Sequence, residues 1–308
     1  MRTNLLAVVP AALVLIGAAA MAACSDTTSP ASDQSDVIQS LTDEYGAQMD
    51  TDFGAVGGTT SDVPTAAAPA GFRADVLADT ATLPAFWGRL RIIPGGPKPI
   101  LDRNVVIQGD TAKVTQTISF QGLFLVDTTA DTVFNPSSKQ LNEGMTQSAV
   151  LVRDAARPHH WRAVSLSLQN WLPTDVAART VAVTQITVKV NDTIRITADT
   201  PDSLYTVGRM LHLHMGDTVS VTASVTNSDA TYSPTTFVFL HVRHAYNDLF
   251  WHRVPMRNNG DGTFSRTWVV ARRGIDRFII DAINAATLER GTLNNYDANE
   301  WGIPYRID

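Results

Sequence analysis

The chain has 308 residues, a formal net charge of −6 and 44 % hydrophobic residues. A mildly acidic chain without a block of basic residues is a poor candidate for binding nucleic acid. Its single cysteine excludes an intramolecular disulfide framework, so the fold must depend on an apolar core.

The first 23 residues have the layout of a secretory signal peptide. Arg2 supplies a positive start, residues 5–16 are an almost unbroken apolar run, and small residues follow at 17–20. The run is short for a membrane span, and no later apolar run reaches 18 residues. We therefore expect residues 1–23 to be removed and no transmembrane helix to follow.

The end of this run, Met21-Ala22-Ala23-Cys24, resembles the lipobox of bacterial lipoproteins. The resemblance implies cleavage before Cys24, diacylation of its thiol and attachment to a membrane of the cell envelope. Two or more acyl chains give stable anchoring. Ser25 stands where Asp would retain such a protein at the inner membrane, which favours the outer membrane. The alternative is an ordinary secreted protein cleaved at the same small residues.

Residues 24–36 are mostly polar and predict a flexible tether between the lipid and the folded part. Apolar residues then recur at helical spacing over 37–49, which predicts a short helix. A second short helix is expected over 83–90, including Phe86 and Trp87.

Beyond this point the hydrophobic pattern changes to period two, which is typical of antiparallel strands with one buried face. In the first hairpin, a loop at 108–111 would pair Ile107 with Ala112 and Val105 with Val114. Both apolar sets then share one face, as strand register requires.

In a later hairpin, a three-residue loop at 191–193 would pair Val190 with Ile194 and Val188 with Ile196. Both isoleucines would then face the core. A two-residue loop would place Ile194 opposite a lysine, so three residues are preferred.

Residues 157–158 form the turn of another expected hairpin, in a sheet with one exposed face. The pattern of the final hundred residues favours a β-sandwich. The nearly continuous apolar run at 236–242 predicts a central strand, and several short strands separated by turn residues follow.

The run from 210 to 308 resembles the bacterial immunoglobulin-like domains of exported proteins. The similarity lies in Met215-Gly216-Asp217-Thr218-Val219, in Gly260-Asp261-Gly262-Thr263-Phe264, and in Gly274 before the strand at 278–282. It implies an adhesive or spacer module. The element order of the preceding region is similar to cystatin-like or nuclear transport factor-like α+β domains.

The predicted fold class is therefore mainly β. An α+β N-terminal domain with an antiparallel sheet is expected over 37–182, followed by an immunoglobulin-like β-sandwich over 183–308.

Histidines form the first group of candidate site residues. His212 and His214 are two apart on a predicted strand, so they share one face, and His241 and His244 lie on another strand. Such residues could bind zinc, but no neighbouring acidic residue completes a metal motif. We expect no metal and no cofactor.

Aromatic residues near predicted loops form the second group. Trp251, Tyr296 and Trp301 could stack against sugar rings. The more ordinary role for such residues is to fill the ends of a sandwich.

No nucleophile elbow, phosphate loop or dinucleotide motif occurs in the chain. We therefore predict a non-enzymatic, membrane-anchored envelope lipoprotein that acts as a protein-interaction or spacer module, with an envelope protein or glycan as its partner. Two alternatives stay open, a carbohydrate-binding surface lipoprotein and a metal-dependent hydrolase.

Overall fold

The computed structural model describes residues 30–49, 84, 86–91, 93, 95–129, 135–231, 235–242, 252–270, 274–289 and 296–307. The expected signal peptide at 1–23 and the expected lipidation site Cys24 lie outside these residues. The fold is mainly β with antiparallel sheets, as predicted. The strand pairs are antiparallel throughout the described parts except for β10 with β17, which is parallel.

The larger sheet, sheet A, has 12 strands in the described residues. Its main path runs β1-β3-β4-β6-β17-β16-β12-β13, and β2, β5, β9 and β10 attach at its sides. The strands are β1 (Phe86–Leu90), β2 (Ile100–Gln108), β3 (Thr111–Asp127), β4 (Ser137–Arg153), β5 (Trp161–Leu166), β6 (Gln169–Pro173), β9 (Tyr205–Thr206), β10 (Leu211–Leu213), β12 (Thr236–Val242), β13 (His252–Pro255), β16 (Gly274–Asn284) and β17 (Ala298–Ile307).

The smaller sheet, sheet B, has five strands in the order β14-β15-β11-β7-β8. They are β7 (Val181–Val190), β8 (Thr193–Ala198), β11 (Thr218–Asn227), β14 (Arg257–Asn258) and β15 (Thr263–Val269). The described residues also form three short 3₁₀ helices, η1 (Val176–Ala178), η2 (Val207–Arg209) and η3 (Ala285–Leu288).

Helix α1 (Pro30–Met49) confirms the helix expected over 37–49 but begins earlier. Residues 30–36, expected in the flexible tether, are helical. Proline fits the first turn of a helix, and Asp33 is an acidic residue near the positive N-terminal end. Asp33 also accepts a hydrogen bond from Arg153 at 3.1 Å, which ties this first turn to the sheet.

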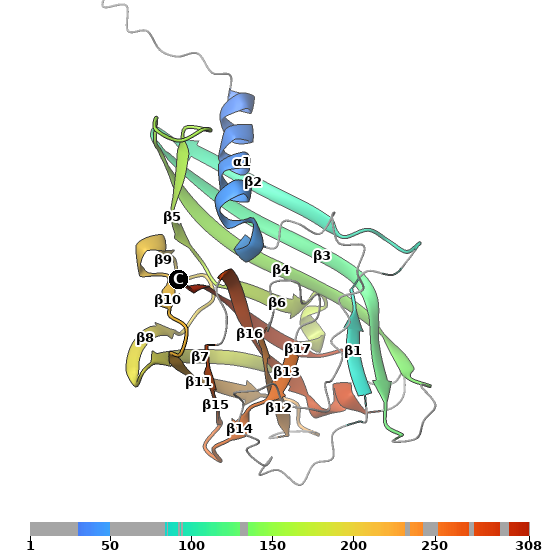
Figure 1. Cartoon of the computed structure of the whole chain (residues 1–308). Coiled ribbons are helices and arrows are strands. Elements are labelled where there is room, and N and C mark those ends of the chain that lie inside the picture. The colour runs from blue at the N-terminus through green and yellow to red at the C-terminus, as the bar shows by residue number, and fades with distance from the viewer. Residues whose placement is uncertain are drawn as a thin grey trace, which may run out of the picture.

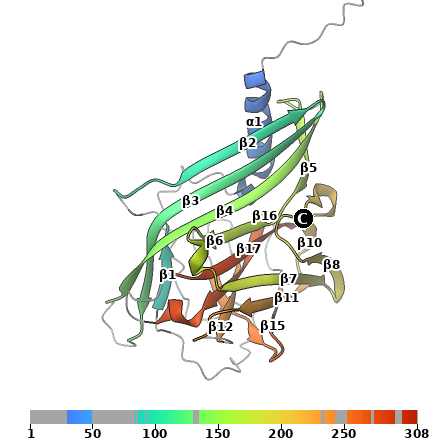
Figure 2. The same cartoon turned by 180° about the vertical axis from the view of Figure 1, so that it is seen from behind.

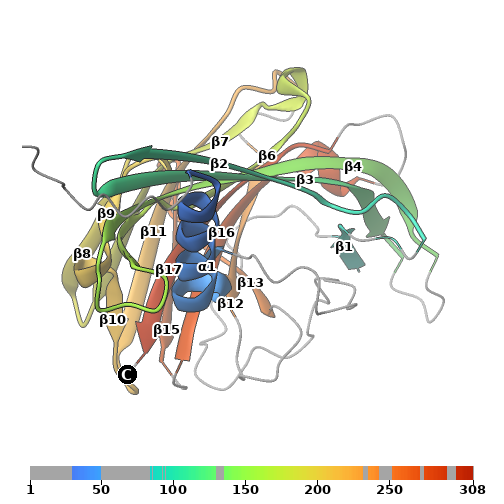
Figure 3. The same ribbon diagram turned by 90° about the horizontal axis from the view of Figure 1, so that it is seen from above.

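The long strands β2, β3 and β4 arch across the molecule, and α1 lies on their concave side (Figures 1 and 3). Val37 and Leu41 of α1 are buried one helical turn apart. They pack in one apolar cluster with residues of β3, β4 and β5, namely Ala112, Val114, Ala149, Leu151, Trp161, Ala163 and Leu166.

Residues 86–90 form strand β1, whereas a helix was expected over 83–90. The strand pairs antiparallel with β3, from Phe86 opposite Asp127 to Leu90 opposite Leu123. Tertiary pairing overrides the helical spacing of the apolar residues here. Because strand side chains alternate, Trp87 and Arg89 share a face, and both are buried.

The first predicted hairpin is confirmed in register. Val105 lies opposite Val114, and Ile107 lies opposite Ala112. Gly109 at the turn has a φ of +58°, a conformation that glycine adopts without strain.

The register predicted for the hairpin at 191–193 is wrong in one pair. Val188 lies opposite Ile196 as expected, but Ile194 lies opposite Lys189, and a β-bulge separates the two pairs. The loop is the two residues Asn191 and Asp192, both at positive φ, which asparagine and aspartate tolerate better than most residues. The bulge moves Ile194 to the surface, where it is 58 % exposed.

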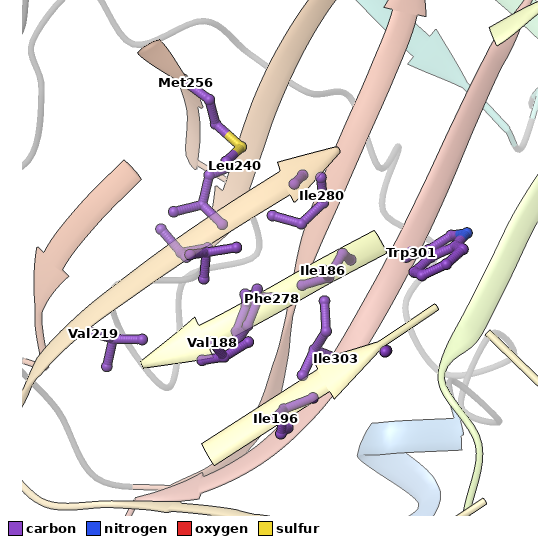
Figure 4. Packing of buried hydrophobic residues seen from close by; sticks show 14 of the residues in the cluster. Ile186, Val188, Ile196, Val219, Leu240, Met256, Phe278, Ile280, Trp301 and Ile303 are labelled. Atoms are coloured by element: carbon purple, nitrogen blue, oxygen red, sulfur yellow. The ribbon is translucent and has the colours of Figure 1, made fainter. Parts of the chain in front are cut away.

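Strands β12, β16 and β17 are buried on both faces. On one face, their residues pack against sheet B in the largest apolar cluster, which includes Leu240, Phe278, Ile280, Trp301 and Ile303 from these strands and Ile186, Val188, Ile196 and Val219 from sheet B (Figure 4). On the other face, Phe237, Phe239 and Ile283 pack with Trp87 and Phe124. The central position expected for 236–242 is confirmed, because β12 lies between β16 and β13.

Strand pairing in sheet A crosses the expected domain boundary between residues 182 and 183. Strand β6 pairs on one side with β4 and on the other with β17 (Figure 2). The two expected regions therefore share a continuous sheet, and the division of the chain into two domains stays a prediction.

Candidate functional site

Seven side chains on the inner face of sheet A form a network that we name the buried ionic cluster. It consists of two guanidinium groups, three carboxyl groups, a phenol and an imidazole, from Arg89, Arg91, Glu143, Asp281, Glu300, Tyr296 and His241. Arg91 keeps 12 % of its side chain exposed, and the other six side chains are buried.

The strand register brings these charges together from distant parts of the chain. Asp281 of β16 lies directly opposite Glu300 of β17. Two ionised carboxyl groups in such a pair repel each other, and a cation between them or a proton on one of them relieves the repulsion. Arg89 from β1 supplies it, since its Nη1 and Nη2 donate to the two carboxylate oxygens of Asp281 at 2.7 and 2.8 Å. Its Nε lies 3.1 Å from Oε1 of Glu300.

Arg91, just after β1, connects the other two carboxyl groups. Its Nε donates to Oε2 of Glu143 at 2.7 Å, and its Nη2 donates to Oε1 of Glu300 at 2.8 Å. The guanidinium also stacks over Trp171, with 4.3 Å between its central carbon and the ring centroid. Charge-assisted bonds of this kind are the strong class of protein hydrogen bonds.

Tyr296 and His241 add two further polar groups that contact the carboxyl groups of the cluster. The Tyr296 hydroxyl accepts from Nε of Arg89 and donates to Oε1 of Glu143, both at 2.7 Å. Nε2 of His241 lies 2.9 Å from Oδ2 of Asp281.

The environment gives the three carboxyl groups of the cluster different pKa values. Burial alone would raise the pKa of Asp281, but Arg89 outweighs it and holds that pKa at about 2. In the same way, Arg91 and Arg89 outweigh burial and lower the pKa of Glu143. The pKa of Glu300 is raised to about 8, because burial and the charges of Glu143 and Asp281 outweigh the attraction of the two arginines.

Charge balance in the cluster depends on both Glu300 and His241. Two guanidinium groups face three carboxyl groups, so one negative charge is in excess when every carboxyl group is ionised and the imidazole is neutral. A proton on Glu300 removes that excess without breaking the short ion pairs of Asp281 and Glu143. Burial tolerates charges best when each has a partner.

On the same face as the buried ionic cluster, a side chain joins the two end strands of the main path of sheet A. The end strands β1 and β13 meet where Nη2 of Arg253 donates to the backbone oxygen of Trp87 at 3.0 Å. The guanidinium carbon lies 3.2 Å from the centroid of the Trp87 ring, which itself packs against Phe239. The buried ionic cluster also connects β1 to β16 and β17, through the contacts of Arg89 with Asp281 and Glu300.

Lys139 is a further buried cation on this face. Its Nζ donates to the backbone oxygens of Ala286 and Thr287 in η3, both at 2.8 Å. Burial lowers its pKa to about 8. The bonds hold η3 against β4.

None of these cluster residues except Tyr296 and His241 was a candidate from the sequence. A signal was present, because Asp281 interrupts the apolar run 278–283 and Glu300 lies near the start of a strand that is otherwise mostly apolar. A charged residue within a buried strand requires a partner. A single sequence does not identify that partner when it lies about 200 positions away.

The structure does not bring the histidine candidates together. His212 lies in β10 and His214 directly follows it, and both are exposed, as the alternation with Leu211 and Leu213 requires. His241 is buried on β12, with β16 and β17 between it and β10. His244 lies outside the described residues. Within those residues, no group of three or more His, Cys, Asp or Glu side chains is placed to hold a metal ion.

The aromatic candidates are buried where the structure describes them. Trp301 is in the core between the two sheets, and Tyr296 is in the buried ionic cluster. Neither ring therefore forms an exposed platform for a sugar, because the apolar core and the arginines cover them. Trp251 lies outside the described residues.

Comparison with protein-family models, with curated proteins and with solved structures finds no match for this chain. Among the helices of the described residues, none combines the length and the apolar character that crossing a membrane would require.

Proposed function

We propose that the chain is a non-enzymatic lipoprotein of the cell envelope, anchored by lipid on Cys24, that contacts a protein partner through the open edge of β2. The observation that carries the contact is the exposure of apolar side chains on that strand. The anchoring rests on the lipobox-like sequence before Cys24.

Strand β2 offers a nine-residue edge at the rim of sheet A. Within the described residues it pairs with β3 alone. Ile100 is 66 % exposed, and Leu101 and Val106 are also exposed. Natural edge strands usually hide such residues, because an open edge with apolar side chains pairs readily with another strand. An extended segment of a partner could add to this edge through main-chain hydrogen bonds.

The arrangement of the second half supports an immunoglobulin-like sandwich as the body of this module. Strands β11 and β15 of sheet B face β12, β16 and β17 of sheet A across a shared core. Strands β11 and β12 are consecutive in the chain but lie in opposite sheets, as in the Greek-key connections of such sandwiches.

The state of the buried ionic cluster supports a non-enzymatic role. Its ionisable groups already bind one another, and six of its seven side chains are buried. A general acid or base must reach a proton on its substrate. The cluster is therefore better suited to hold β1 in the sheet than to act on a bound molecule.

The contact is tested with a photo-activated cross-linking amino acid at Ile100 in intact native envelopes. Val176 on η1 is the matched control, because it is equally apolar and 70 % exposed but lies outside sheet A. We expect one protein to cross-link at Ile100 and not at Val176. Equal products at both positions, or a second copy of this chain as the sole product, would overturn the proposed partner contact.

The anchoring is tested separately by the mass of the protein purified from membranes. We expect cleavage before Cys24 and the added mass of two or more acyl chains on that residue, and the Cys24→Ala protein should carry no acyl chain. An unacylated Cys24 in the membrane-bound protein would exclude lipid on that thiol as the anchor.

A further inference from the structure

Strand β2 carries one charged side chain in an otherwise apolar row on its concave face. That face is the one toward α1, because its partners on β3 include Ala112 and Val114, which pack with the helix. Side chains alternate along a strand, so every second residue of β2 lies there. These residues are Leu101, Arg103, Val105 and Ile107. Arg103 therefore interrupts a row of apolar side chains at the rim of sheet A.

The partner of Arg103 on the neighbouring strand is neutral. Nε of Arg103 donates to Oε1 of Gln116 on β3 at 2.9 Å. Burial lowers the pKa of the half-buried guanidinium, and no carboxyl group in the described part of the chain opposes that shift. By contrast, Arg89 and Arg91 of the same sheet each bind carboxylates. A partly buried cation bound only to an amide gains most from a carboxylate supplied by another molecule.

An added strand would bring its side chains directly beside those of β2. Among the described strands β2 pairs with β3 alone, and it lies at the rim of the arch (Figure 2). Side chains directly opposite each other in an antiparallel pair share one face, with Cβ atoms about 4.5–5.5 Å apart. The residue opposite Arg103 can therefore reach the guanidinium. The residues two positions before and after it would lie beside Leu101 and Val105.

The convex face of β2 has the opposite charge at the adjacent position. Asp102 lies there between Ile100 and Asn104, and all three side chains are exposed. A carboxylate that an added strand placed beside Asp102 would be repelled, because like charges directly opposite each other destabilise a strand pair. The two faces of β2 therefore specify on which face of the added strand an acidic side chain is accepted.

We propose that β2 accepts an extended protein segment with a carboxylate side chain beside Arg103 and apolar side chains two positions before and after that carboxylate. The inference rests on the proposed partner contact at β2 and names the chemistry of that partner. The apolar side chains cover Leu101 and Val105, and the carboxylate accepts charge-assisted hydrogen bonds from the guanidinium. A segment with lysine or arginine at the same position is rejected, because it would bring two cations together on a partly buried face.

Binding of a matched pair of labelled peptides to the full-length protein tests this chemistry. Each peptide has nine residues, the length of β2, and alternates valine with threonine, with lysines added at both ends for solubility. One peptide has glutamate at its central valine position, and the other has glutamine, which has the same shape without the charge. We expect the wild type to bind the glutamate peptide about three- to tenfold more tightly, as measured by fluorescence anisotropy.

Three variants assign the preference to Arg103. Arg103→Gln should bind both peptides equally, because the charge that distinguishes them is gone. Arg103→Lys keeps a cation and should retain part of the preference, and complete loss there would assign the effect to the shape of β2 instead of its charge. Arg195→Gln is the matched control, since Arg195 is an exposed arginine on β8, the edge strand of sheet B, and its replacement should leave the preference unchanged.

Equal binding of the two peptides to the wild type would overturn the inference, as would a preference that persists undiminished in Arg103→Gln or the absence of binding by either peptide. The partner contact itself is decided apart from these results, by the cross-link at Ile100 in envelopes. A single cross-linked protein together with equal peptide binding would retain the contact and remove its acidic chemistry. A glutamate preference without any cross-link would retain the chemistry of the edge and remove the contact in the envelope.

Discussion

Arg89 and Asp281 form a two-point ion pair in which both side chains are fully buried, although 192 positions separate them in the chain. The pair joins β1, at one end of sheet A, to β16 near the other end. Breaking one side of such a pair leaves an uncompensated charge in the interior.

Asp281→Asn should therefore lower the free energy of unfolding by about 3–5 kcal/mol, because Arg89 loses its main counter-charge without regaining water. Urea unfolding at pH 7 measures the change. Asp102→Asn on the exposed face of β2 is the matched control and should leave stability nearly unchanged. A loss in Asp281→Asn no larger than in the control would show that the ion pair does not hold β1.

Glu300→Gln should reveal the neutral acid in the cluster. The folded-state pKa of Glu300, about 8, lies above the ordinary value of 4.5, so the folded protein retains a proton that the unfolded chain loses. The Glu300 contribution to stability is fully present below pH 4.5 and is lost as the pH rises toward 8.

Glutamine has the shape of the neutral acid and does not titrate, so the stability of Glu300→Gln relative to the wild type should rise by about 2–4 kcal/mol between pH 4.5 and pH 8. Chemical unfolding of both proteins across that range measures it. A constant difference between the two proteins would mean that Glu300 is ionised in the cluster throughout.

Gly122 of β3 is the position where β1 approaches most closely. A Cβ added there would overlap the backbone oxygen of Leu90, so Gly122→Ala must displace the end of β1 that carries Arg89 and Arg91. We expect a loss of about 1–3 kcal/mol or more in the free energy of unfolding.

Gly144 of β4 provides the comparison, since the nearest atom to its added Cβ is 3.8 Å away. Gly144→Ala should be neutral or stabilise by up to about 1 kcal/mol, through the reduced entropy of the unfolded chain. If thermal unfolding ranked the two variants equally, the close approach of β1 to β3 would be wrong.

The bulge in β8 gives a prediction from two isoleucines two positions apart. Ile196 is buried between the sheets and Ile194 is exposed, so Ile196→Ala should cost about 2–4 kcal/mol and Ile194→Ala less than about 0.5 kcal/mol. Equal costs would instead support the three-residue loop that places both on the core face.

The parts of the fold that sequence patterns predicted correctly are those that local alternation controls. The register of Val105 and Ile107 against β3 follows from one apolar face and a short turn. The same reasoning failed at Ile194, because a bulge changes the register without a strong signal in composition.

Long-range pairing explains the other differences. Residues 86–90 have apolar spacing that suits a helix, and they become a strand because β3 and the buried carboxylates hold them. The buried ionic cluster was not predicted for the same reason, since Arg89 and Glu143 are ordinary charged residues until the sheet brings them to β16 and β17.

Strand β17, residues 298–307, is the last described element of the chain, yet it pairs with β6, β10 and β16. It also contributes buried apolar residues to both faces of sheet A, Trp301 and Ile303 on one face and Ala298 on the other. Contacts this distant in sequence form late and slowly, since much chain must be ordered before they are made. Neither face of sheet A is complete until β17 has been made and can pair. The strands that precede β17 in the chain therefore stay incompletely paired and partly uncovered up to that stage of synthesis.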